Sequence, residues 1–246
     1  MTTRHTALLI NVHPEWRELL SDALDAMDPG YLHGLTSSSD WLPGKALLLA
    51  AFRTPLSQAR YILFGESPYP RQASANGYAF WDAAVESLWS KRGLSKEINR
   101  ATSLRNLMKM FLYARGSLQD DRTQDVIAKL DQSIYYQTAD SMFTGLLEKG
   151  FILLNASLVY HEGKIPYHAR MWRPFIRVLL DRLVAYNPSF QLILFGRIAE
   201  QIPERERFSC LIAEHPYNLS FITNPQVVDF FKPLDILVDH DKKHHG

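Results

Sequence analysis

Cysteine is nearly absent from the sequence, and its scarcity excludes several classes of protein. Cys210 is the single cysteine, so the chain has no internal disulfide framework and no paired-cysteine zinc or iron–sulfur site. Such a composition is typical of a reducing compartment, and we expect a cytoplasmic protein. We expect no metal site either, because the two adjacent histidines of the C-terminal DKKHHG are interpreted as part of a solvated tail.

Long apolar runs and an excess of charge are also missing. No stretch reaches the roughly 18 apolar residues that a membrane helix needs, and the first seven residues are too polar for a signal peptide. We therefore expect no membrane partner. Lys and Arg total 27 against 26 for Asp and Glu, which gives a net charge of +1. Any binding to a polyanion would depend on a local basic face.

The apolar residues that are present suffice for one large core. The chain has 246 residues, of which 46% are hydrophobic, and we expect a single domain over residues 1–246 that acts as a monomer. Apolar runs without alternation predict buried strands. These runs are Tyr61–Phe64, Phe151–Leu154, Gln191–Phe195 and Cys210–Ala213.

Segments with helical patterns separate the predicted strands. We expect helices over residues 14–27, 46–52, 82–91, 104–115, 141–149 and 169–185. Asp28, Pro29 and Gly30 would end the first of them, while Thr102 and Ser103 would cap the fourth. The alternation predicts an α/β fold of three α/β/α layers, with a central four-stranded parallel sheet and helices on both faces.

Each predicted strand ends in a polar turn. GESPYP follows the first strand, Asn155 ends the second, Gly196 and Arg197 follow the third, and HPYNLS follows the fourth. In open α/β sheets, ligands bind at the carboxyl ends of the parallel strands. We therefore expect the four turns to surround one pocket, with the chemistry concentrated at residues 65–80.

These turns resemble the motifs of the uracil-DNA glycosylase superfamily, most closely its classical branch. GESPYP, followed by GYAF, resembles Gly-Gln-Asp-Pro-Tyr-His with its later Gly-x-x-Phe. ILLNASL resembles Leu-Leu-Asn-x-x-Leu, SLRNL resembles a Pro-rich Ser-Leu segment without the prolines, and HPYNLS resembles His-Pro-Ser-Pro-Leu-Ser. The resemblance implies a uracil-DNA glycosylase-like fold and DNA as the partner.

The resemblance also implies an activity and the residues that recognise the base. A DNA glycosylase of this kind hydrolyses the N-glycosidic bond of a flipped-out uracil or modified pyrimidine, without metal or cofactor, and leaves an abasic site. Phe80 would stack on the base, and the Asn155 amide would read its polar edge. Tyr69 would fill the space beside C5 and exclude a methyl group. His215 would donate a hydrogen bond to the base oxygen as negative charge develops there.

Four further residues would contact DNA outside the base. By resemblance, Leu219 is the apolar wedge that fills the gap left by the flipped base. Ser103, Ser220 and Arg197 would bind phosphates, with Arg197 standing where the family usually has Ser.

Ser67 departs from the family pattern, because it occupies the place of the catalytic Asp. A neutral hydroxyl orients water but offsets the positive charge on the sugar poorly. Some branches of the superfamily have Glu one residue earlier, in Gly-Glu-x-Pro, so Glu66 is a candidate for the catalytic carboxylate. Glu66 could instead be a structural replacement for the family's Gln. Asp82 is a weaker candidate.

Two functions therefore stay open at the level of sequence. The first is a monofunctional DNA glycosylase. The alternative is a non-catalytic DNA-binding or damage-sensing relative that lost turnover together with the Asp. The sequence does not choose between uracil and a modified pyrimidine, between single and double strands, or between repair and attack on foreign modified DNA.

Overall fold

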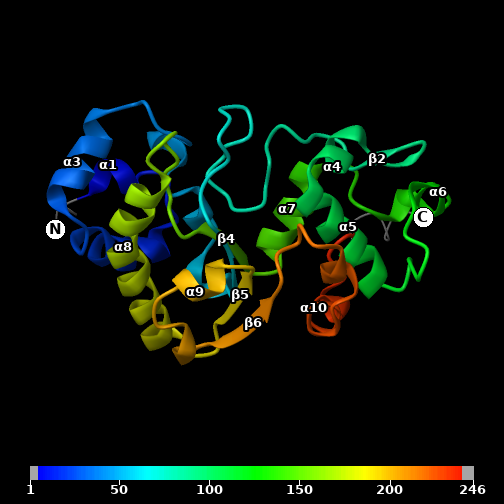
Figure 1. Ribbon diagram of the computed structural model, residues 1–246. Coiled ribbons are helices and arrows are strands. Elements are labelled where there is room, and N and C mark those ends of the chain that lie inside the picture. Colours follow the sequence, from blue (N-terminus) through cyan, green and yellow to red (C-terminus); the bar gives the residue numbers. More distant parts are fainter. Residues whose placement is uncertain (1–4, 240–246) are drawn as a thin grey trace. The chain divides into compact units, whose positions relative to one another are not determined.

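The computed structural model describes residues 5–239 (Figure 1). The DKKHHG tail interpreted above lies outside the described residues. Contacts between residues divide the chain into two compact units, and each unit is made of two separate stretches of the sequence. The first unit comprises Met1–Asp82 and Gly150–Cys210, and the second comprises Ala83–Lys149 and Leu211–Gly246. The expectation of one domain stays a prediction.

A four-stranded parallel sheet is the central element of the fold. Its strands are β1 (Tyr61–Gly65), β4 (Phe151–Asn155), β5 (Gln191–Phe195) and β6 (Ser209–Ala213). Their order across the sheet is β4-β1-β5-β6. Each strand lies within one residue of its predicted range. The α/β prediction with a four-stranded parallel sheet is confirmed.

Burial on both faces explains the unbroken apolar sequences of the central strands. Side chains along a strand point alternately to opposite faces. Ile62 and Phe64 of β1 belong to one large core cluster, whereas Leu63 between them is equally buried but lies outside that cluster. Helices α2 (Arg17–Asp25) and α8 (Ile165–Tyr186) contribute to the same cluster and pack against each other.

Helix α3 (Pro29–Ser37) is an element that the sequence reading missed. Asp28, Pro29 and Gly30 are predicted only to end a helix, yet they begin this one. The Asp28 carboxylate accepts a hydrogen bond from the backbone N–H of Tyr31 at 2.7 Å, and Pro29 takes the first helical position. The prediction was incomplete because these residue types both stop and start helices.

The predicted helix over residues 82–91 was wrong. The segment forms a turn at residues 83–84 and then a short strand, β2 (Trp89–Ser90), which pairs antiparallel with β3 (Gly93–Leu94). The Leu88 N–H donates to the distant Gln137 carbonyl at 3.0 Å instead of closing a helical turn. The helix predicted over residues 46–52 was also wrong, since that segment forms two short 3-10 turns.

The remaining helices are short, apart from α5. They are α1 (Thr6–Leu9), α4 (Lys96–Arg100), α5 (Thr102–Ala114), α6 (Gln124–Ala128), α7 (Ala139–Glu148), α9 (Ile198–Gln201) and α10 (Pro225–Phe231). Thr102 and Ser103 do not cap α5 as predicted. They lie in its first turn, and Ala101 is the N-cap without a side-chain hydrogen bond. Among the described residues, no helix is long and apolar enough to cross a bilayer.

Candidate active site

Gly65 and Asn155 are the last paired residues of β1 and β4. A methyl group on Gly65 would lie 2.5 Å from Oδ1 of Asn155 and 2.9 Å from Cβ of Ala79. Glycine therefore makes room for the Asn155 amide across the end of β1. Asn155 is only 3% exposed, and its Oδ1 lies against the place that a side chain on residue 65 would take. A side-chain amide carries both a donor and an acceptor, which suits a polar ligand.

Tyr69 and Phe80 are tied together in the segment that follows β1. The Tyr69 hydroxyl donates to the Phe80 carbonyl oxygen at 3.2 Å. Burial, reinforced by the negative charge of Asp82, raises the pKa of Tyr69 far above its ordinary value, so the hydroxyl keeps its proton. The Tyr69 side chain is thereby fixed in place.

Phe80 has a backbone conformation that non-glycine residues rarely adopt. Its φ is +63°, and its ring meets Phe195 of β5 edge-on, with the ring centroids 6.4 Å apart. The neighbouring Ala79 N–H donates to the Leu153 carbonyl of β4 at 3.1 Å. Strained residues of this kind persist where the surroundings hold them, often at functional sites. Tyr69, Phe80 and Asn155 thus lie in the first unit, in or after the ends of β1 and β4.

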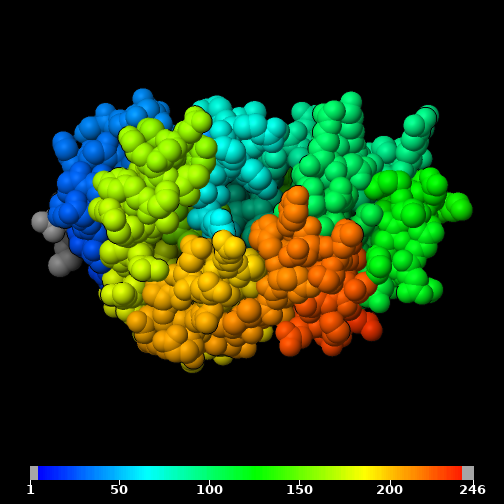
Figure 2. All heavy atoms as spheres, viewed as in Figure 1, coloured from blue at the N-terminus to red at the C-terminus, as the bar shows by residue number. Residues whose placement is uncertain are grey.

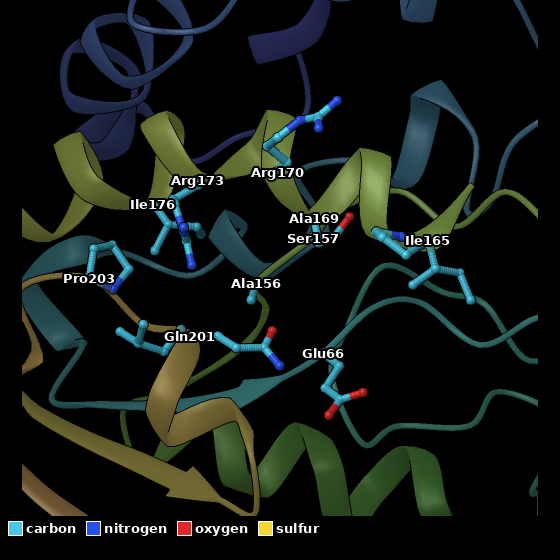
Figure 3. A pocket seen from close by; sticks show the side chains of 12 residues that line it. Glu66, Ala156, Ser157, Ile165, Ala169, Arg170, Arg173, Ile176, Gln201 and Pro203 are labelled. Carbon is cyan, nitrogen blue, oxygen red and sulfur yellow. The ribbon is translucent and has the colours of Figure 1, made fainter. Parts of the chain in front are cut away.

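Glu66 lines a cavity of about 490 Å³ in the first unit (Figure 3). Its carbonyl oxygen accepts the Ser157 N–H at 3.0 Å, which joins the turns after β1 and β4. The view shows the guanidinium of Arg173 extending from α8 into the cavity, whereas Arg170 turns away. Neither Asn155 nor Phe80 is among the described residues that line this cavity. Glu66 therefore shares this cavity with residues of α8 and not with Asn155 or Phe80.

Two other polar residues lie in or near this turn. Ser67 is partly buried and follows Glu66 directly. Asp82 is almost fully buried, and its carboxylate accepts a hydrogen bond from the exposed Arg71 at 3.1 Å. The negative charge of Asp82 contributes to the raised pKa of Tyr69. The sequence alone ranks Asp82 below Glu66, but its burial makes it a serious candidate.

His215 follows β6 in the second unit. Its Nδ1 accepts the backbone N–H of Tyr217 at 3.1 Å. In the neutral ring the proton is therefore on Nε2, which becomes a donor. The loop is braced by Asn106 of α5, a fully buried side chain whose amide donates to the Pro216 carbonyl at 2.7 Å. The Asn218 N–H closes the turn on the His215 carbonyl at 2.9 Å.

Asn106 is a positioning residue that the sequence reading missed. It lies among the apolar residues of α5, and a polar residue on a buried helical face was the available signal.

The residues predicted to contact DNA are distributed over both units. Leu219 is 72% exposed, and Ser220 beside it is also exposed. Burial raises the pKa of Glu214, but hydrogen bonds from the backbone, Ser220 and Asn224 outweigh this effect and lower it.

Ser103 and Arg197 complete the set. Ser103 is partly buried in the first turn of α5, in the second unit. Arg197 is exposed at the N-cap of α9, in the first unit.

Several known proteins are similar to this chain in sequence or in structure. No protein-family model matches the sequence. The uracil-DNA glycosylase of Wolinella succinogenes is 22% identical, over 86% of this chain and 83% of its own length. That of Thermobifida fusca is 26% identical, over 83% of this chain and 79% of its own length.

Solved structures give a stronger match. The structure of mimivirus uracil-DNA glycosylase has a TM-score of 0.55 at 16% identity, covers 85% of this chain and 71% of that one, and supports the fold alone. The wild-type UNG crystal structure from Nitratifractor salsuginis has a TM-score of 0.90 at 40% identity, over 95% of this chain and 96% of that one. With this identity along nearly the whole of both chains, and the homologues' names in agreement, the chain belongs to the uracil-DNA glycosylase superfamily.

Proposed function

We propose that the protein is a monofunctional DNA glycosylase that flips uracil out of DNA and hydrolyses its N-glycosidic bond. The relatives named uracil-DNA glycosylase support a DNA glycosylase activity. The observation that carries the finer proposal is the buried Asn155 side chain, whose Oδ1 faces the space that Gly65 leaves free. One amide can donate to and accept from the polar edge of a pyrimidine.

Tyr69 supports uracil rather than an enlarged pyrimidine as the substrate. A pocket for a 5-substituted base would require this side chain to move aside. Its hydroxyl is bonded to the Phe80 carbonyl and its ring is largely buried, so movement would break that bond and expose apolar surface. The side chain therefore stays in place and excludes a methyl group at C5.

His215 serves the departing base in this proposal. When the bond between C1′ and the base nitrogen breaks, its electron pair goes to the base, and negative charge spreads onto the base oxygens. The Nε2–H of neutral His215 donates to such an oxygen and stabilises the charge in the transition state. Water then adds to C1′ and loses a proton, which neutralises the departed base anion, and the abasic sugar remains.

We assign to Glu66 the role of the carboxylate that orients the attacking water. Within residues 5–239 its side chain makes no hydrogen bond or ion pair, so an exposed Glu66 is able to turn toward a bound sugar. Asp82 would first have to release Arg71. The Ser67 hydroxyl follows Glu66 on the same turn and offers the water a second hydrogen bond.

The experiment is an excision assay on oligonucleotides that contain uracil, thymine or a bulky cytosine derivative, followed by alkali to break abasic sites. We expect breakage at uracil alone. Asn155→Ala and Glu66→Gln should each lower the rate about 100-fold or more, as expected for loss of a transition-state contact. Tyr69→Ala should begin to remove thymine.

The same assay separates the non-catalytic alternative, which Ser67 favours. DNA binding by the wild-type protein without strand breakage after alkali would establish the alternative and refute the glycosylase. A sharp rise in uracil release by Ser67→Asp would instead identify a weakened version of the family site.

A further inference from the structure

The loop after β6 presents two large apolar side chains to solvent. Tyr217 is 68% exposed and Leu219 is 72% exposed, which places both among the most exposed large apolar residues of the described chain. In Figure 2 the orange surface around this part of the sequence ends in a projecting knob. The family motif has Ser at the position of Tyr217, so resemblance assigns this ring no role.

Hydrogen bonds hold the backbone of the loop at both sides of Tyr217. The Asn106 amide reaches the carbonyl oxygens of Pro216 at 2.7 Å and Tyr217 at 3.4 Å. The Tyr217 N–H is bonded to His215, and the Asn218 N–H to the His215 carbonyl. A fixed backbone that carries an exposed aromatic ring is preorganised for contact, because little freedom is lost on binding.

We propose that Tyr217 is a second wedge residue, which packs with Leu219 against the base pair beside the everted nucleotide and makes the protein favour double-stranded DNA. This inference rests on the proposed function. Aromatic rings stack on bases of any sequence, and apolar wedges enter base steps that have been unstacked. The ring adds a flat face to the wedge that Leu219 alone does not offer.

The preference for duplex DNA follows because only a duplex has a gap between base pairs after the nucleotide is flipped out. Removing a nucleotide from a duplex leaves a space between two base pairs, opposite an unpaired base, and that space must be refilled. A single strand has no opposing base and leaves no such space. The contribution of Tyr217 is therefore confined to duplex substrates.

The test measures binding to one stable probe, an oligonucleotide with a tetrahydrofuran abasic analogue, as a duplex and as a single strand. We expect Tyr217→Ala to raise the duplex Kd about tenfold, in keeping with the loss of one base–aromatic stack, and to leave the single-strand Kd unchanged. Tyr217→Phe should bind as the wild type does. The matched control is Tyr186→Ala, which removes a 54% exposed tyrosine at the end of α8 and should change neither Kd.

A second readout excludes a merely structural role. 2-Aminopurine placed next to the analogue should be quenched by the wild type and by Tyr217→Phe, but not by Tyr217→Ala. The alanine variant keeps the backbone N–H that bonds His215, so the histidine is not disturbed. Equal weakening on both substrates, or no weakening, would overturn the inference. The probe needs no hydrolysis, so a wild type that binds it but excises no uracil would refute the proposed function alone.

Discussion

Gly65 and Asn155 face each other across the ends of two neighbouring strands, with no room for a methyl group between them. Gly65→Ala would place a Cβ against both the Asn155 amide and Ala79, so one of these must shift. We expect a loss of about 1 to 3 kcal/mol in unfolding free energy, as for other overpacked sites, and a fall in uracil excision of about 100-fold. Urea unfolding and single-turnover excision measure the two effects.

Gly34→Ala is the matched control for that substitution. Gly34 lies inside α3, and a Cβ there meets nothing within 4 Å. Alanine should therefore stabilise the protein by about 0.5 to 1 kcal/mol through helix propensity and leave excision unchanged. If both variants lost excision equally, the close approach of Gly65 to Asn155 would not be the cause.

His215 should act through the proton on Nε2. His215→Ala removes the donor, and we expect excision in a single turnover to slow about 100- to 1,000-fold, as for other lost transition-state donors. His215→Gln keeps an N–H at a similar distance from the backbone and should recover part of the rate. A Gln variant as slow as the Ala variant would contradict a hydrogen-bonding role.

The strands could be predicted because consecutive apolar residues in the sequence indicate that a strand is buried. A strand covered on both faces needs consecutive apolar residues, as in Leu63 between Ile62 and Phe64. The segment over residues 82–91 could not be assigned in this way. Its Leu88 N–H bonds the carbonyl of Gln137, and a partner so distant along the chain leaves no local pattern.

In the candidate site, too, residues with a local sequence signal could be predicted, and residues whose function depends on distant contacts could not. Turns at strand ends are local, so Asn155 and His215 were found from their places after predicted strands. Asn106 was not, because its function depends on the carbonyl of Pro216, 110 residues later. The cavity that Glu66 lines together with residues of α8 also depends on tertiary packing.

Asn106→Leu tests the brace of the loop. Leucine has a similar shape but donates no hydrogen bond, so the Pro216 carbonyl loses its bond to Asn106. We expect a loss of about 1 to 3 kcal/mol in unfolding free energy, the usual cost of leaving a buried polar group unsatisfied. Excision from duplex DNA should fall as well, because His215 and Leu219 are no longer held. Urea unfolding together with duplex excision would check this, and unchanged values for both would show that the brace is dispensable.

His168 should make the protein sensitive to acid. Its ring is buried in the first unit, and Nδ1 shares a 2.7 Å hydrogen bond with the Tyr31 hydroxyl. Burial lowers the pKa of His168, and the positive charges of His161 and Lys164 lower it further, while Asp40 opposes them.

The sign of this effect follows from proton binding. Since the folded pKa is depressed below the ordinary value of about 6.5, the unfolded chain binds the proton more readily than the folded chain does. The contribution of neutral His168 is complete above about pH 6.5 and is lost as the pH falls below that value. In His168→Gln, whose amide can still bond Tyr31 but does not titrate, the drop in Tm between pH 7.5 and pH 5 should be smaller than in the wild type. An identical drop in both proteins would assign the acid sensitivity to other groups.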